Sequence, residues 1–261
     1  MIKFAVNFSE ESKNLTRDKL INPDLLKCPD WPDLVIEALK INPVYVHFDI
    51  KLGSKKFSQV DWDQVKTLLT LTQTRYVNAH LSFPKTNDLG FYKDLVNQQL
   101  SFLIQEFGNE NIIIENAPFG KNKQSYQYPA SDPEFIGELI KAHQCGFLLD
   151  ISHAIRTAIK LNFPPIDFIQ SFPLSYIKEI HMTGFKTIDG EKMDHYPMQD
   201  EDWQIFVMVL NIIKKINNLP LEIIAFEYGG YGPLFDYRSE KESILSQVPK
   251  FKKIIQETFT L

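Results

Sequence analysis

The sequence predicts an α/β protein folded as a single (β/α)8 barrel, with parallel strands inside and helices outside. Short runs of β-branched and aromatic residues alternate with longer segments whose apolar residues recur at three- and four-residue steps. Eight such strand-like runs in 261 residues match the usual size of this barrel. The alternative is an open doubly wound sheet, but no Gly-x-Gly-x-x-Gly motif follows the first strand.

The eight expected strands are short apolar runs, most of which end near a polar or charged residue. They cover residues 2–7, 24–28, 43–50, 76–81, 111–115, 146–151, 177–183 and 222–227. The second has the weakest pattern, because the sequence Cys-Pro-Asp-Trp-Pro follows it closely. Amphipathic segments between the strands are expected to be helices, at residues 31–41, 62–71, 91–107, 133–143, 202–216 and 239–258.

The composition excludes several classes of protein. A net charge of −5 gives no general attraction to nucleic acid, and no block of five Lys or Arg residues occurs. No apolar run approaches the roughly 18 residues that a transmembrane helix needs. Two cysteines without CxxC spacing fit a reducing compartment. We therefore expect one cytoplasmic domain over residues 1–261, without a membrane partner and with nucleic acid as a disfavoured partner.

Imidazoles and carboxylates recur late in six consecutive strands. The steps between them are 33, 35, 35, 31 and 46 residues, and the first four are close to one strand-helix-strand unit. The residues are His47, His80, Glu115, Asp150, His181 and Glu227. The barrel should bring them together at the carboxyl ends of its strands, where barrel enzymes place their chemistry. The three carboxylates among them are the expected catalytic residues.

Three further candidates, His153, Asp194 and His195, are expected in loops above the same rim. One histidine alone is usually a structural residue. Several acids and imidazoles converging in one barrel mouth, however, would leave buried charges without compensation. A metal cluster removes that cost, because imidazole and carboxylate are ligands of iron, zinc and manganese. A purely structural hydrogen-bond network is the alternative.

Weaker candidates for substrate contact are Lys27, Asn78, Asn116 and Tyr228. Lys27 faces the same mouth and could bind an anionic group, although an ordinary surface lysine is the favoured explanation. Asn78 and Asn116 flank ligands and could hydrogen-bond them. Tyr228 begins an aromatic loop that either closes over substrate or forms a simple Gly-rich turn. His143, at a polar helix end, is expected to be solvated.

Five segments carry a resemblance to a known family: GFLLDISHA, IKEIHMTGF, MDHYPMQDEDW, ENAP and FEYGG. The first three look like family patterns written LLDvnN, eiHlaGh and DtHxxPVxdxvW. The family is that of the multinuclear non-haem iron-dependent oxidases, within the wider group of xylose-isomerase-like and endonuclease-IV-like barrels. The similarity runs from about VHFDIKLGS to the end of the chain.

The resemblance implies two or three bound metal ions, with iron favoured and zinc or manganese as alternatives. Three ligand sets are implied, with Glu115 bridging the first two ions: His47, His80 and Glu115; Asp150, His181 and Glu227; His153, Asp194 and His195. The chain departs from the family pattern in two places. His153 stands where the oxidases commonly have Asn, and the Asp-x-His pattern is contracted to the adjacent Asp194 and His195, so that either could be the ligand.

Three functions are open. The favoured one is an oxidase that uses dioxygen on a small thiol or on a cysteine-containing peptide presented by a partner protein, because iron with these ligands keeps positions open for dioxygen and a thiolate. The second is a divalent-metal sugar (phosphate) isomerase or epimerase, or an endonuclease-IV-like phosphodiesterase, acting on a small molecule or on a nucleic acid. The third is a barrel that binds metal or peptide without catalysis.

Overall fold

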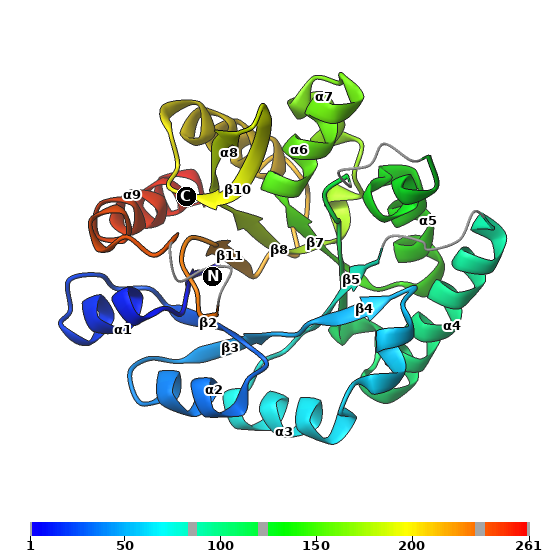
Figure 1. Cartoon of the computed structure of the whole chain (residues 1–261), viewed down its shortest axis with the longest axis horizontal. Coiled ribbons are helices and arrows are strands. Elements are labelled where there is room, and N and C mark those ends of the chain that lie inside the picture. Colours follow the sequence, from blue (N-terminus) through cyan, green and yellow to red (C-terminus); the bar gives the residue numbers. More distant parts are fainter. Residues whose placement is uncertain (1, 83–87, 120–124, 233–237, 260–261) are drawn as a thin grey trace.

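A ring of parallel strands with helices on its outside forms the body of the molecule (Figure 1). The computed structural model describes residues 2–82, 88–119, 125–232 and 238–259. Neighbouring strands follow the order β3-β2-β1-β11-β8-β7-β6-β5-β4 around the ring, and every pair is parallel. The α/β barrel predicted from the sequence is therefore confirmed.

Seven of the eight expected strands and all six expected helices are present as single elements, with ends that differ by a few residues. The strands are β1 (Lys3–Asn7), β2 (Leu25–Pro29), β3 (Val44–His47), β4 (Ile50–Leu52), β5 (Val77–Leu81), β6 (Ile112–Glu115), β7 (Gly146–Asp150), β8 (Ile177–Met182) and β11 (Ile223–Phe226). The helices are α1 (Glu10–Arg17), α2 (Pro32–Leu39), α3 (Trp62–Thr72), α4 (Leu89–Phe107), α5 (Pro133–His143), α6 (Ile151–Leu161), α7 (Pro165–Gln170), α8 (Asp200–Ile213) and α9 (Lys241–Phe259). Helices α1, α6 and α7 were not among the expected elements.

The prediction of one strand over residues 43–50 is wrong, because this segment closes the ring as two strands. β3 pairs with β2 on one side, whereas β4 pairs with β5 on the other. At the change of partner, the Phe48 amide donates to Asn78 Oδ1 (2.7 Å), and Asn78 Nδ2 donates to the Phe48 carbonyl (3.0 Å). The Asn78 side chain thus supplies two hydrogen bonds where the strand ladder is interrupted.

Side chains alternate between the inside and the outside of the barrel along each strand. An apolar layer fills the interior below the mouth: Ala5, Leu25, Tyr45, Tyr76, Ile113, Leu148 and Ala225. Two residues further along the same strands are polar or charged side chains: Asn7, Lys27, His47, Asn78, Glu115, Asp150 and Glu227. The period of two therefore stacks a reactive layer directly on an apolar floor.

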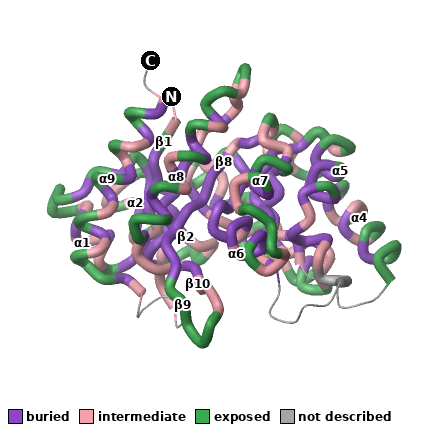
Figure 2. Tube along the Cα trace, turned by 90° about the horizontal axis from the view of Figure 1, so that it is seen from above, coloured by how far each residue is buried: buried purple, intermediate pink, exposed green. Residues whose placement is uncertain are grey.

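An antiparallel hairpin, β9 (Gly184–Ile188) and β10 (Glu191–Tyr196), follows β8 and projects from one end of the barrel (Figure 2). The sequence analysis expected a loop here, and that expectation is wrong. At the base of the hairpin a Cβ on Gly184 would lie 2.2 Å from the Pro197 carbonyl oxygen, so only glycine permits this close approach. The hairpin carries two of the candidate ligands.

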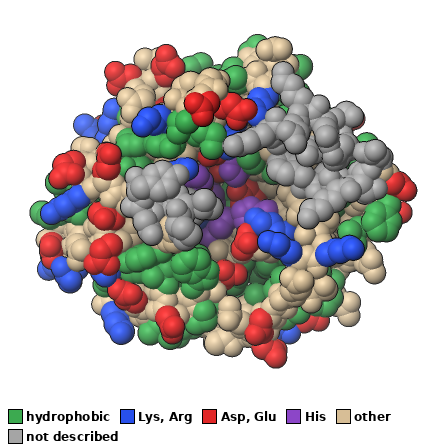
Figure 3. Space-filling view, in the orientation of Figure 1, with side chains coloured by type: hydrophobic (Ala, Val, Ile, Leu, Met, Phe, Trp, Pro, Cys, Tyr) green, Lys and Arg blue, Asp and Glu red, His purple; other side chains and the backbone are tan. Residues whose placement is uncertain are grey.

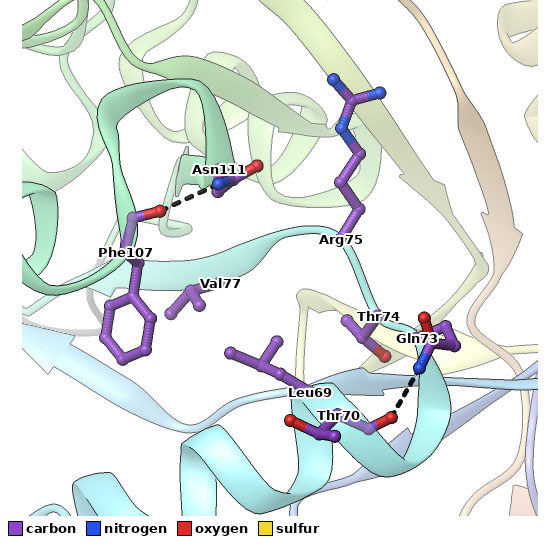
Figure 4. A pocket seen from close by; sticks show the side chains of 8 residues that line it. All are labelled: Leu69, Thr70, Gln73, Thr74, Arg75, Val77, Phe107 and Asn111. Carbon is purple, nitrogen blue, oxygen red and sulfur yellow. Dashed lines mark hydrogen bonds between the residues drawn. The ribbon is translucent and has the colours of Figure 1, made fainter.

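A pocket of about 580 Å³ lies at the opposite end of the barrel, where β5 begins (Figure 4). It is lined by Leu69, Thr70, Gln73, Thr74, Arg75, Val77, Phe107 and Asn111. None of these eight lining residues is an acid, a histidine or a cysteine, so this pocket offers no candidate metal ligand. Among the described residues, no helix has both the length and the apolar character needed to cross a membrane.

Replacing Asn78 with Ala should lower the free energy of unfolding by about 1–3 kcal/mol, because the buried backbone groups of Phe48 lose their partners. Urea denaturation in the presence of a chelator measures this effect without a contribution from bound metal. Asn211→Ala, at an exposed position of α8, is the matched control and should change the value by less than about 0.5 kcal/mol. Equal effects of the two substitutions would contradict a role for Asn78 in closing the ring.

Candidate metal centre

The barrel brings the predicted imidazoles and carboxylates together at the carboxyl ends of its strands. Histidine side chains gather in a hollow in the middle of this face, with acidic side chains beside them (Figure 3). Several of these groups are almost fully enclosed, since Glu115 is 2%, Asp150 1% and His181 0% exposed. Charged and polar groups at such depth need compensation from partners or ions.

Glu115, at the end of β6, lies between two groups of imidazoles. Its Oε2 is 2.9 Å from His80 Nδ1 and 3.4 Å from His47 Nε2. Its Oε1 is 3.6 Å from Nδ1 of His153 on the other side. The strand register explains the first contact, because His80 of β5 is directly opposite Glu115. Each carboxylate oxygen therefore faces a different set of nitrogen atoms.

His181 joins the centre to a carboxylate that the sequence analysis missed. Its Nδ1 is 3.0 Å from Glu227 Oε1, while its Nε2 is 2.5 Å from Glu179 Oε1. Glu179 is buried and also accepts a hydrogen bond of 2.9 Å from the Tyr45 hydroxyl. The available signal was a glutamate two residues before His181 in the same strand, hence on the same face.

Asp150 has two structural roles that explain the sequence between it and His153. It ends β7 and is the N-cap of α6, where its Oδ1 accepts a hydrogen bond of 2.8 Å from the His153 amide. His153 was expected in a loop, but it lies in the first turn of α6, so that expectation is wrong. The Asn116 side chain makes two hydrogen bonds of 2.9 Å to the Asp150 backbone. Capping and this amide fix the position of the carboxylate.

A β-bulge in β10 brings Asp194 and His195 towards the centre although they are adjacent. The strand register shifts between Met193 and Tyr196, and His195 adopts a left-handed backbone (φ 61°). Adjacent residues of a regular strand would point to opposite faces, and a bulge re-aims one of them. Asp194 Oδ2 is 3.7 Å from His153 Nε2, and the His195 Nδ1 atom is 3.1 Å from the Glu227 carbonyl oxygen.

The sequence analysis favoured Lys27 as an ordinary surface lysine, and the structure overturns this. Lys27 is 6% exposed and forms an ion pair with Glu227 inside the barrel. Burial lowers its pKa to about 8, against the opposing effect of the surrounding carboxylates. Tyr228 is buried, and its hydroxyl accepts a hydrogen bond from the Glu240 amide. Contact of Lys27, Tyr228 or the two asparagines with substrate stays a prediction.

His143 lies outside the centre, at the end of α5, where its Nε2 is 2.8 Å from Asn97 Oδ1. Burial lowers its pKa. The expectation that it is not a ligand agrees with this position, although the ring is half-buried and bonded to α4 instead of simply solvated.

On the Glu115 side of the centre, the pKa of the carboxyl group and the pKa of a neighbouring imidazole are both lowered. Burial would raise the pKa of Glu115, but the imidazoles of His80 and His47 outweigh it and hold that pKa well below its usual range. Burial lowers the pKa of His47 well below its usual range, and the charge of Lys27 acts in the same direction.

On the hairpin side, the pKa values of His153 and His195 are shifted in opposite directions. Burial would lower the pKa of His153, but the carboxylates of Asp150 and Asp194 outweigh it and raise that pKa above its usual value. Burial lowers the pKa of His195 to about 4, so this ring is neutral. Burial would raise the pKa of Asp194, but the neighbouring histidines hold it below its usual value.

Several polar atoms of the candidate ligands are buried without a hydrogen-bond partner. Among the described residues, Nδ1 of His47, Oε2 of Glu115 and Nδ1 of His181 are buried and lack a hydrogen-bond partner. Three groups have ligand atoms within 4.8 Å of one another: His47, Glu115 and His181; Glu115, Asp150 and His153; Asp150, His181 and Glu227. Ligand atoms that converge without hydrogen-bonding to one another indicate a position for a cation between them. No group of three found among the described residues includes Asp194 or His195.

Relatives and solved structures agree with this architecture. A UPF0276 protein of Acaryochloris marina is 26% identical over 188 residues, a stretch that covers 64% of this chain and 65% of that protein. The chain spans about half to two thirds of the length of the curated relatives it matches.

Among solved structures, a D-tagatose 3-epimerase-like protein superimposes with a TM-score of 0.64 at 16% identity, over 98% of each chain. Endonuclease IV from Thermus thermophilus superimposes with a TM-score of 0.58 at 12% identity, over 98% of this chain and 99% of that one. Identities this low show a common fold alone.

A profile of the family described as RiPP precursor modification enzyme MbnB/TglH/ChrH matches residues 34–223, which is more than half of the chain. The matched segment contains β3 to β8 and the hairpin, and with them every candidate ligand except Glu227. The groups of converging ligand atoms within this segment are candidate metal sites. The chain therefore belongs to the MbnB/TglH/ChrH family of RiPP precursor modification enzymes, which confirms the resemblance carried by its sequence motifs.

Proposed function

We propose that this protein is an oxidase that holds iron at the barrel mouth and acts with dioxygen on a cysteine-containing peptide. One observation carries the proposal: Glu115 belongs to two of the groups of converging ligand atoms, one with His47 and His181 and the other with Asp150 and His153. A carboxylate in this position can bridge two ions a few ångströms apart. The residues assigned to the two ions are His47, His80 and Glu115 for the first, and Asp150, His181 and Glu227, bridged by Glu115, for the second.

Iron, when bound, would supply the redox chemistry that couples oxidation of the peptide to reduction of dioxygen. The surrounding residues prepare the ligands. Glu179 accepts a hydrogen bond from Nε2 of His181 and so leaves Nδ1 facing the metal position. Lys27 balances the charge of Glu227. The apolar layer beneath the mouth keeps water from the ligands on that side, which strengthens electrostatic interactions there.

The substrate is proposed from the family and from the ligand set together. The family description names the modification of RiPP precursor peptides, and such a peptide would enter the open mouth of the barrel. A cysteine thiolate suits iron as an additional ligand. We further propose that a partner protein presents the peptide, that residues 1–261 form one domain, and that the reaction takes place in the cytoplasm. A small thiol is the alternative substrate.

Replacing Glu115 with Ala should reduce the iron content by more than one ion per chain, because both ions lose a ligand. The content is measured by elemental analysis of protein purified anaerobically without chelator. His143→Ala, which alters a ring bonded to Asn97 on the outer helices, is the matched control and should keep the full content. Loss of a single ion from the Glu115 variant would refute the bridging role.

Addition of a cysteine-containing peptide to the anaerobic iron-loaded protein should change its visible absorption, and oxygen should then be consumed on exposure to air. The same peptide with Ser in place of Cys should produce neither effect, because a hydroxyl is a poor ligand for iron compared with a thiolate. Zinc as the only bound metal, with turnover of a sugar phosphate or of abasic DNA, would replace the oxidase by an isomerase or a phosphodiesterase. Little metal of any kind, with peptide binding unaffected by His181→Ala, would indicate a non-catalytic barrel.

A further inference from the structure

An arginine occupies the side of the mouth where a third metal ion would be held. Arg156 lies on α6, three residues after His153, and its Nη1 donates a hydrogen bond of 2.6 Å to Oδ2 of Asp194. Its side chain is only 12% exposed, and that of Asp194 is 7% exposed. A hydrogen bond between two charged groups at this depth is among the stronger polar interactions in proteins.

The oxygen that Arg156 contacts is the one that a third ion would need. Asp194 Oδ2 is 3.7 Å from His153 Nε2, so an ion shared by these two side chains would lie beside the guanidinium. The guanidinium of Arg156 and a metal ion beside it would repel each other strongly, because both are positively charged and the site is partly buried. In agreement, no group of three potential ligands found in the described part of the chain contains Asp194 or His195.

We propose that Arg156 takes the place of a third metal ion, so that the centre of this protein holds two ions. This inference rests on the proposed function, which supplies the two ions. Asp194 is then an anchor that ties the β9–β10 hairpin to α6, and not a ligand. The guanidinium remains positively charged at any physiological pH, so it compensates the charge of the Asp194 carboxylate throughout that pH range.

A second arginine fixes the backbone of the same residue. Arg238 Nη1 donates a hydrogen bond of 3.1 Å to the Asp194 carbonyl, and its guanidinium lies 4.9 Å from the centroid of the Tyr196 ring. The Asp194 main chain and side chain are thus each held by one arginine. The hairpin therefore has little freedom to turn the carboxylate towards an ion between His153 and His195.

The test counts ferrous ions per chain after anaerobic loading with excess iron and gel filtration. Wild type should hold two, and Arg156→Met should hold three, because Asp194 is released to act as a ligand. The double variant Arg156→Met/Asp194→Asn should return to two. Lys160→Met is the matched control, since it removes the other α6–β10 ion pair, with Glu191 (3.7 Å), one turn further from the mouth; it should hold two.

A count of two in folded Arg156→Met, or three in wild type, would overturn this inference while leaving the proposed oxidase intact. A count of zero in wild type would instead refute the proposed function and the inference with it. Thermal unfolding followed by circular dichroism checks that each variant is folded. Should Arg156→Met fail to fold, Asp194→Asn alone decides: two ions support the inference, and one ion makes Asp194 a ligand and overturns it.

Discussion

Several carboxylates are buried together at the barrel mouth, and the rest of the structure depends on how their negative charge is compensated. Removing a carboxylate from water costs several kcal/mol unless a partner replaces the lost hydration. Glu115, Asp150 and Glu179 are each at most 2% exposed, so water cannot provide that compensation. Hydrogen bonds from the backbone and from Tyr45 account for a part of it. The remainder requires positive charge at the mouth itself.

The architecture supplies positions for that charge by simple means. Alternation along parallel strands places one inward side chain per strand in the same layer, so neighbouring strands deliver their polar ends together. Helix capping at Asp150 then adds His153 from the start of α6, and a bulge in β10 adds two more groups from the hairpin. The apolar layer two residues below serves as a rigid floor, which allows the ligands above it to be held without collapsing onto each other.

The sequence predicted the barrel and the six strand-end residues because both follow from a period: about one strand-helix-strand unit along the chain, and two along each strand. The prediction was wrong where one continuous segment forms two different structural elements. Phe48 and Asp49 interrupt one expected strand because β3 and β4 pair with different neighbours. The local sequence pattern does not show which strand lies beside a given segment. His153 was placed in a loop because the acid that ends β7 also starts α6.

The side chains that pair with the candidate ligands could not be predicted from sequence periodicity either. Lys27 resembled a surface lysine, because burial at a strand end depends on what the other strands bring to the same opening. Arg156 is one basic residue on an amphipathic helix, and only the bulge at Asp194 brings a carboxylate to it. Only Glu179 could have been inferred from the sequence, as an acid two residues before His181 in the same strand. Such contacts arise from tertiary packing, to which local sequence patterns are blind.

Compensation takes two forms across the mouth, and this division explains how a crowded set of ligands can serve a small number of ions. At Asp194 the positive charge belongs to the protein, through Arg156, and Lys27 forms an ion pair with Glu227 inside the barrel. Around Glu115 the facing atoms are acceptors and imidazole nitrogens that leave one another unsatisfied. Fixed cations stabilise the fold of the rim whether or not metal is bound. The buried atoms of His47, Glu115 and His181 that lack hydrogen-bond partners are the ones that bound metal ions would satisfy.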